Sequence, residues 1–446
     1  VAPGCRRMIF LVHVPFTADS IEGEVGLADY SYYFVMQAYL PVLQALGRVV
    51  EIADPLREAD AWYRDCAASG EYCVLLCFAP PHRVPTRLEC PVVPVFAWEY
   101  DSLPDEPWGD RRETDWLRVL AMLGSAITHS QFTARVVRRA IRPDYPVVSV
   151  PAPVWDRFAP LAARRRETSG ADRSVELDGT LMDSRACDFT EPPQALIAAH
   201  PRRRQQLCLD GVVYTAVFCP LDGRKNWEDL VSAFCWAFRD VADCTLVLKL
   251  VHHDRDKALE EVLALLRKLP RTPARIVLLH AHLDDAQYAR LICATDFAVN
   301  SSLGEGQCLP LMEYMSAGVP AIAPAHTAML DYLDGECGFP VRAHEELYHW
   351  PQDMGLILRT RRFRPEWEGL RRAYATSREL RGADPDAYAR MAEAASRRLQ
   401  QHCSQDVARE HLARFFAAHA AAIGYARRDA RAAALAATGN APCARS

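Results

Sequence analysis

The stretch Asn300–Pro324, NSSLGEGQCLPLMEYMSAGVPAIAP, decides the fold expected for this chain. A buried strand is predicted to end at its first residue, and a loop bracketed by Gly304 and Gly306 follows. Pro310 suits the first turn of a helix, because a residue at that position has no intrahelical N–H bond to lose. Gly318 ends the helix, and the apolar run after it predicts a further strand. Strand, glycine loop, helix and strand in this order are typical of a parallel α/β sheet.

Two carboxylates lie in this stretch, Glu305 and Glu313, eight positions apart. The glycine and proline between them exclude one continuous helix, so we expect Glu305 on the loop and Glu313 on the first helical turn. Both can then face one cleft beside the free N–H groups of a helix N-terminus. Those groups suit a diphosphate and the carboxylates suit sugar hydroxyls, which together indicate a nucleotide-sugar site. A plain strand–turn–helix with two solvated glutamates is the alternative interpretation.

The whole string, GEGQCLP followed by LMEYMSAGVPAI, resembles the Glu-x7-Glu segment of the retaining, family 4 glycosyltransferases (glycosyl transferases group 1). The resemblance implies that Glu305 is placed at the donor sugar and Glu313 at the ribose. Gln307 and Cys308 replace a more usual Phe-Gly pair, although backbone contacts of the turn to phosphate should survive this change. The turn residues implied to bind the donor are Gly304, Gly306, Gln307, Cys308 and Leu309.

A second motif, Asp222-Gly-Arg-Lys-Asn226, stands where a predicted strand meets a helix N-terminus about 80 residues earlier in the chain. Arg224 and Lys225 there are costly to desolvate unless an anion neutralises them. The motif resembles the turn whose cations hold the donor diphosphate in family 4. The same resemblance implies that Lys249 and Leu283 line the nucleotide-binding site. For Lys249, the alternative interpretation is a surface lysine at the end of a strand.

The first third of the chain repeats short apolar runs and helical stretches, as a doubly wound α/β domain does. Gly26 lies in a loop that resembles, loosely, the glycine loop near the donor phosphates in family 4. Trp98 and Glu99 resemble the Trp-Glu segment that faces the acceptor cleft in some members, and His129 follows the next strand. We therefore assign Trp98, Glu99 and His129 to the acceptor side. Packing plus a solvated acid is the alternative for the Trp-Glu pair.

Composition excludes several classes of protein. The chain has 446 residues, 24% of them charged, and a net charge of −5, so no basic field for nucleic acid is present. No apolar run approaches the roughly 20 residues of a membrane-spanning helix. Fifteen cysteines occur without a Cys-x2-Cys pair, which favours buried free thiols in a reducing compartment. We expect a cytoplasmic protein, with peripheral contact at the inner membrane face left open.

These patterns and the resemblance predict an α/β protein of GT-B architecture, with two facing Rossmann-like domains, a central cleft and C-terminal helices. We expect an acceptor-side domain at residues 1–155 and a donor-side domain at 207–385. A linker with an irregular insertion is expected at 156–206, helices packing back across the domains at 386–425, and a flexible tail at 426–446.

The resemblance implies a retaining, metal-independent glycosyltransferase without a cofactor, whose donor is a UDP- or GDP-sugar. The acceptor is a glycan, a lipid-linked molecule or a small molecule. No metal site is expected, because Asp254-Arg-Asp256 before a helix is more typical of an N-cap than of a metal-binding pair. A nucleotide-sugar epimerase of the same architecture and a catalytically inactive homologue are the alternative hypotheses.

Overall fold

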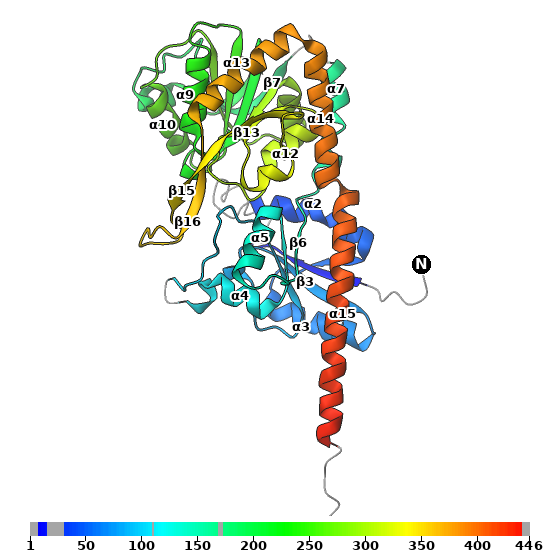
Figure 1. Cartoon of the computed structure of the whole chain (residues 1–446). Coiled ribbons are helices and arrows are strands. Elements are labelled where there is room, and N and C mark those ends of the chain that lie inside the picture. The colour runs from blue at the N-terminus through cyan, green and yellow to red at the C-terminus, as the bar shows by residue number, and fades with distance from the viewer. Residues whose placement is uncertain (1–7, 16–30, 109–110, 168–172, 439–446) are drawn as a thin grey trace, which may run out of the picture.

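The computed structural model describes residues 8–15, 31–108, 111–167 and 173–438, and of residues 113, 166–167 and 423–438 it describes the backbone alone. It contains two α/β domains, one above the other in Figure 1, each built on its own sheet. Long helices at the end of the chain run beside both domains. This is the two-domain arrangement expected from the sequence.

The N-terminal sheet has six strands, all parallel, in the order β2-β1-β3-β4-β5-β6. Its inner strands are continuous apolar runs because both faces are covered by helices. The strands are β1 (Met8–His13), β2 (Arg48–Glu51), β3 (Tyr72–Phe78), β4 (Val92–Phe96), β5 (Ala126–Thr128) and β6 (Val147–Ser149). The helices are α2 (Ser31–Leu46), α3 (Pro55–Ala68), α4 (Trp116–Leu123) and α5 (Gln131–Ala140).

The C-terminal sheet has eight strands in the order β14-β13-β12-β9-β10-β11-β7-β8. The run from β14 to β11 is parallel, whereas β7 pairs antiparallel with β11 and β8 antiparallel with β7. The strands are β7 (Ser174–Asp183), β8 (Arg203–Cys208), β9 (Val212–Phe218), β10 (Cys244–Leu250), β11 (Arg275–Ala281), β12 (Phe297–Val299), β13 (Ala321–Pro324) and β14 (Gly338–Val341). The helices between them are α8 (Pro193–Ala199), α9 (Trp227–Ala237), α10 (Arg255–Leu266), α11 (Asp285–Ala294) and α12 (Leu309–Ser316).

Local sequence explains where these helices begin. Asp254 caps α10 by accepting a hydrogen bond from the backbone N–H of Lys257, which confirms the N-cap interpretation of the Asp-Arg-Asp sequence. Pro310 lies in the first turn of α12. Gly318 follows that helix with a φ of 72°, a left-handed conformation that glycine adopts without steric cost. The predicted boundaries of the deciding stretch are therefore confirmed.

Residues 156–206 differ from the expected irregular insertion. They contain α6 (Trp155–Phe158), α7 (Leu161–Glu167), β7, α8 and most of β8, and the last two strands extend the donor-side sheet. The arginine-rich sequence around 202–204 favoured a loop, but β8 is the edge strand of the sheet. Charged side chains are common on edge strands because they prevent pairing with other chains.

The chain ends in three helices, α13 (Trp367–Ala383), α14 (Pro385–Cys403) and α15 (Gln405–Thr438). Contacts of α14 with α12 and of α15 with α2 carry the chain back across both domains (Figure 1). Helix α15 continues into the stretch expected to be a flexible tail from residue 426. Before these helices, β15 (Ala343–Tyr348) and β16 (Thr360–Pro365) form a separate antiparallel hairpin.

One buried carboxylate ties the C-terminal helices to the sheet. The carboxylate of Asp296 is 4% exposed, and it accepts hydrogen bonds from the backbone N–H of Val213 and from the guanidinium groups of Arg173 and Arg381. Removing it would leave two partly buried cations and a backbone donor without their partner.

We therefore expect Asp296→Ala to lower the free energy of unfolding by about 3 kcal/mol, which corresponds to a melting temperature roughly 3–6 °C lower for a chain of this size. The matched control is Asp240→Ala, which removes an exposed carboxylate paired with Arg239 and should change stability by less than about 0.5 kcal/mol. Thermal unfolding followed by circular dichroism measures both. Equal melting temperatures for the two variants would contradict the structural role of Asp296.

Candidate functional site

The site lies where the chain order of the C-terminal sheet reverses. Strand β9 lies between β10 and β12, so the connections after β9 and β12 leave the sheet in opposite directions. In open α/β sheets, ligands bind in the crevice that this reversal creates at the carboxyl ends of the strands. The turn Gly223–Lys225 follows β9, and the loop that holds Glu305 follows β12.

Glu305 is the centre of a cluster of charged side chains. Its carboxylate is 5% exposed, and it accepts hydrogen bonds from Lys225 Nζ at 2.7 Å and from Arg224 at 3.1 Å. The hydroxyl of Ser302 donates to the same carboxylate at 2.6 Å, and the Glu305 backbone N–H donates to Thr327 Oγ1. The structure therefore brings together Glu305, Arg224 and Lys225, the residues that the sequence resemblance assigns to the donor sugar and the donor diphosphate.

The two cations determine the charge of Glu305. Burial alone would raise the pKa of its carboxyl group, but the charges of Lys225 and Arg224 and the hydrogen bonds from Lys225 and Ser302 outweigh it and hold that pKa far below its usual range. Glu305 is thus ionised at every physiological pH. It can accept hydrogen bonds from hydroxyl groups and stabilise nearby positive charge, but it cannot donate a proton.

Arg224 connects the cluster to the other domain. Its guanidinium pairs with Glu305 and with Asp222 of its own domain, and it pairs at 3.1 Å with Glu99, which follows β4 of the N-terminal domain. Burial raises the pKa of Glu99, and the Arg224 charge partly opposes this shift. Glu99, predicted on the acceptor side, therefore lies at the interface between the domains with the donor-side arginine as its partner.

The two domains approach closely at the glycines of the loop, which leaves no room for a side chain at position 306 and little at position 304. A Cβ atom at position 306 would lie 2.6 Å from the Cβ of Ala97, and one at position 304 would lie 3.0 Å from the backbone oxygen of Glu99. Gln307 also contacts the N-terminal domain, because its side-chain oxygen accepts a hydrogen bond from the Ala152 N–H at 3.1 Å. The loop that follows β12 therefore also forms part of the contact between the two domains.

Cys308 and Leu309 form the start of α12. Cys308 is buried, is the N-cap, and has a φ of 62°, with its side chain making no capping hydrogen bond. Burial raises the pKa of its thiol, so it stays protonated, and its sulfur accepts a hydrogen bond from Asn300. Leu309 packs, partly buried, on the large core cluster of the molecule.

Glu313 has its own surroundings, apart from the Glu305 cluster. It lies in the second turn of α12, one turn later than predicted, and accepts a hydrogen bond from the Tyr288 hydroxyl at 2.6 Å. Burial raises the pKa of its carboxyl group to about 7, and the Tyr288 hydrogen bond and the Arg157 charge partly oppose this rise. The two carboxylates of the motif therefore differ in charge state near neutral pH, and they share no hydrogen-bond partner in the described part of the chain.

Three further donor-side predictions fall around the same sheet. Lys249 lies near the carboxyl end of β10, where its ammonium group donates to the Leu250 carbonyl, and burial lowers its pKa to about 8. Leu283 precedes α11 and packs, half-buried, on the core beside β11. Gly26 lies outside the described residues, so its prediction stays open.

Two acceptor-side predictions fall in the N-terminal core instead of an open cleft. Trp98 is 5% exposed, donates its indole N–H to the Ser102 carbonyl and packs against Trp116. His129 is 1% exposed, and its Nδ1 bonds the Val150 carbonyl. Burial lowers the pKa of His129 to about 4, so the ring is neutral. Of the acceptor-side set, only Glu99 touches the charged cluster.

Sequence reasoning missed three polar residues of the cluster, Asp222, Ser302 and Thr327. The first two carried a weak signal, since each stands two or three residues from a predicted site residue on the same turn. Thr327 carried none, because it follows the next strand, β13, and reaches the Glu305 backbone only in the folded chain. Its φ of 47° is strained for a β-branched residue.

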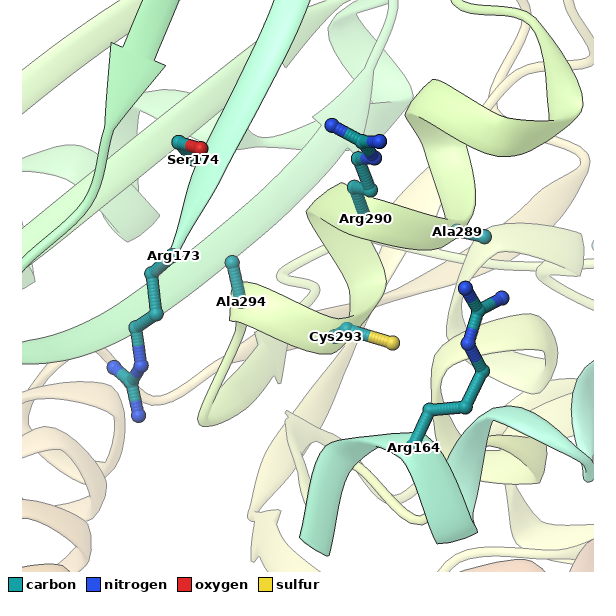
Figure 2. A pocket seen from close by; sticks show the side chains of 7 residues that line it. All are labelled: Arg164, Arg173, Ser174, Ala289, Arg290, Cys293 and Ala294. Atoms are coloured by element: carbon teal, nitrogen blue, oxygen red, sulfur yellow. The ribbon is translucent and has the colours of Figure 1, made fainter. Parts of the chain in front are cut away.

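A separate pocket of about 250 Å³ lies between α7, α11 and the start of β7 (Figure 2). It is rich in arginine, but Arg173 and Arg290 point to opposite sides of the view, and Arg173 is paired with Asp296. The side chains therefore do not converge on one bound anion. The lining residues are Arg164, Arg173, Ser174, Ala289, Arg290, Cys293 and Ala294.

Among the residues that the structure describes, no group of three or more His, Cys, Asp or Glu side chains has an arrangement that could hold a metal ion. None of the helices in that part of the chain combines the length and the apolar character needed to cross a membrane. The thirteen described cysteines are all free, and most are buried.

Comparison with known proteins adds a family match. Residues 212–349, from β9 to the end of β15, match the family model described as Glycosyl transferases group 1. This stretch contains Arg224, Lys225, Glu305 and Glu313. A search of curated proteins finds no match to the chain.

Solved structures share the fold at low sequence identity. Sucrose-phosphate synthase from Thermosynechococcus elongatus has a TM-score of 0.56 at 16% identity, over 94% of this chain and 100% of that one. A glycosyltransferase from Rickettsia africae has a TM-score of 0.54 at 11% identity, over 92% and 98%. Anabaena HepE, solved in complex with UDP-glucose, has a TM-score of 0.51 at 12% identity, over 92% and 99%. The predicted GT-B fold is therefore confirmed, and the family match supports a glycosyltransferase.

The raised pKa of Glu313 predicts a stability difference that depends on pH. An unfolded glutamate ionises near pH 4.5, whereas the folded group stays protonated up to about pH 7, so its contribution to stability is lost as pH rises through this window. Glu313→Gln removes this loss. We expect its melting temperature to be close to that of the unchanged protein below pH 4.5 and a few degrees higher at pH 8, with the exposed Glu336→Gln as control. A difference that does not grow with pH would mean that water solvates the Glu313 carboxylate.

Proposed function

We propose that this protein is a retaining glycosyltransferase that moves a sugar from a nucleoside-diphosphate sugar to an acceptor without a divalent metal. The observation that carries the proposal is the contact of Arg224 and Lys225 with Glu305 at the switch point of the donor-side sheet. The match of residues 212–349 to the family of group 1 glycosyl transferases supports it. The matched family consists of transferases, so the epimerase alternative is not favoured.

Arg224 and Lys225 are assigned to the donor diphosphate. When the bond between the anomeric carbon and the phosphate oxygen breaks, the leaving nucleoside diphosphate gains negative charge. Two fixed cations at the carboxyl end of the sheet stabilise that charge as it develops. Their present partner, Glu305, shows that this part of the crevice already holds an oxyanion within 2.7 Å of Lys225 Nζ.

Glu305 is assigned to the transferred sugar and Glu313 to the ribose. The permanently ionised Glu305 accepts hydrogen bonds from sugar hydroxyls, and its charge favours the oxocarbenium-like state that glycosyl transfer passes through. Glu313 has a charged neighbour, Arg157, and accepts a hydrogen bond from the Tyr288 hydroxyl. These surroundings suit binding of a group that changes little during the reaction. Departure and attack on the same face of the sugar would retain the anomeric configuration.

A donor screen tests the proposal. Purified protein is incubated with UDP-glucose, UDP-N-acetylglucosamine and GDP-mannose, and free nucleotide and sugar isomers are separated by chromatography. UDP-glucose is tried first, because the HepE structure contains it. Release of UDP or GDP supports the proposal and should persist in excess EDTA. Formation of an isomer without free nucleotide would indicate an epimerase, and binding without turnover an inactive homologue.

Lys225→Gln should weaken binding of the nucleoside diphosphate product, because it removes a charge-assisted contact to phosphate. We expect a loss of about 1.5–3 kcal/mol, measured by isothermal titration calorimetry. Lys257→Gln on α10 is the matched control, since Lys257 is an exposed lysine and should leave product affinity unchanged. Equal product affinities for the two variants would show that the diphosphate does not bind at Lys225.

The two glutamates should affect different kinetic parameters. Contacts of Glu305 to the sugar tighten as the ring distorts, so Glu305→Gln should lower kcat by roughly two orders of magnitude or more. Contacts of Glu313 to the ribose are equal in ground and transition states, so Glu313→Gln should mainly raise the KM for the donor. Steady-state kinetics with one donor measure both. A larger loss of kcat in Glu313→Gln, with donor KM unchanged, would reverse the two assignments.

A further inference from the structure

The tip of the β15–β16 hairpin exposes an unusual amount of apolar surface. Of the eleven large apolar side chains that are exposed in the described part of the chain, five lie between residues 347 and 358. Their exposed fractions run from 51% to 94%, and residues 354–358, Met-Gly-Leu-Ile-Leu, are exposed without interruption. The five are Leu347, Met354, Leu356, Ile357 and Leu358. Apolar surface concentrated in this way marks an interaction site.

The backbone of the tip holds these side chains outward. Asp353 accepts hydrogen bonds from the backbone N–H groups of Gly355 and Ile357, and its own carbonyl accepts one from Leu356. Leu356 has a φ of 51°, a conformation that costs a leucine more than it would cost glycine or asparagine. The fold gains little buried apolar area from this strained leucine, since Leu356 is 61% exposed.

The base of the hairpin, in contrast, is fixed to the N-terminal domain. The Trp350 indole donates to the Ser102 hydroxyl, which in turn donates to the Arg359 carbonyl. Asp101 accepts hydrogen bonds from the Thr360 hydroxyl and the Arg361 N–H. The hairpin therefore projects as a supported arm (Figure 1), and its base is bonded to Asp101, which lies two residues along the chain from Glu99 of the charged cluster.

We propose that this tip docks the protein on a lipid bilayer by inserting Met354, Leu356, Ile357 and Leu358 into the interface. A stable dimer needs roughly 20–30 residues on each side, far more than a tip of five. A bilayer needs no matching pocket, and it takes up a convex apolar loop in proportion to the area buried. The hairpin lies beside the interdomain site, so docking brings that site to the membrane surface.

The charges of the hairpin determine which bilayer it recognises. Arg359 pairs with Glu106 and Asp353, and Arg361 pairs with Asp101 and Glu345. The only charged side chain between residues 353 and 358 is Asp353, which is paired and largely covered. The other two arginines of the arm, Arg362 and Arg364, pair with Glu346. Every arginine of the arm thus has a carboxylate partner, so the arm offers no unpaired positive charge to anionic headgroups. Apolar insertion drives binding, which should be similar on neutral and anionic vesicles and little changed by salt.

Flotation of the full chain with vesicles of phosphatidylcholine, alone or with 30% phosphatidylglycerol (about 3:7), tests the proposal. The test pair is Met354→Ser with Leu358→Ser, and the matched control is Met122→Ser with Leu56→Ser, which removes the same residue types from exposed positions elsewhere. We expect the unchanged protein and the control to float with both vesicles. The tip variant should bind at least fivefold more weakly, with an unchanged melting temperature.

Three results would overturn the proposal: no flotation of the unchanged protein, equal flotation of the tip variant, or a lipid-free dimer that the tip variant abolishes. The last result would show that a second copy covers the tip. Flotation needs neither donor nor acceptor, so its failure and the failure of the glycosyltransferase assignment are measured separately.

Discussion

A buried carboxylate next to two partly buried cations is the constraint on which the site depends. Glu305 is enclosed by β12, the following loop and the neighbouring domain, so its charge would be very costly without Lys225 and Arg224. These cations reach it because β9 and β12 are neighbours although 80 residues separate the two turns. The parallel order of the sheet is thus what assembles the cluster.

The same cluster connects the two domains. Arg224 pairs with Glu99 where the Gly304–Gly306 loop passes close to residues 97–99, and a Cβ atom at position 306 would collide with Ala97 there. The β15–β16 hairpin reinforces this contact from both sides. The Phe363 N–H of β16 donates to the Leu303 carbonyl, and the start of the same strand, at residues 360 and 361, donates to Asp101 of the N-terminal domain. Loop, arginine and hairpin therefore form one continuous contact between the domains.

Much of this could be predicted from sequence, because its signals are local. Glycine and proline fixed the boundaries around α12, apolar runs marked the inner strands, and the Arg-Lys turn before α9 indicated an anion site. What could not be predicted depends on distant partners. The sequence around Trp98 resembles a segment that faces a cleft, but the Trp98 side chain packs on Trp116. Thr327 follows a different strand from Glu305 and contacts it only in the folded chain. The polar strand β8 also looked like a loop, because it is the edge strand of the sheet and lacks the apolar pattern of inner strands.

The charge balance of the cluster has a consequence for ligand binding. Two cations, Arg224 and Lys225, face three carboxylates, those of Glu99, Asp222 and Glu305, so the cluster without a ligand is neutral only when one carboxyl is protonated. Glu99, whose pKa burial raises, is the carboxyl best suited to take that proton. Each guanidinium nitrogen of Arg224 has a carboxylate partner, and Glu99 is the partner contributed by the opposite domain. On the proposed assignment, a diphosphate that displaced Glu99 from Arg224 would weaken the contact between the domains, so that one guanidinium group would couple donor binding to that contact.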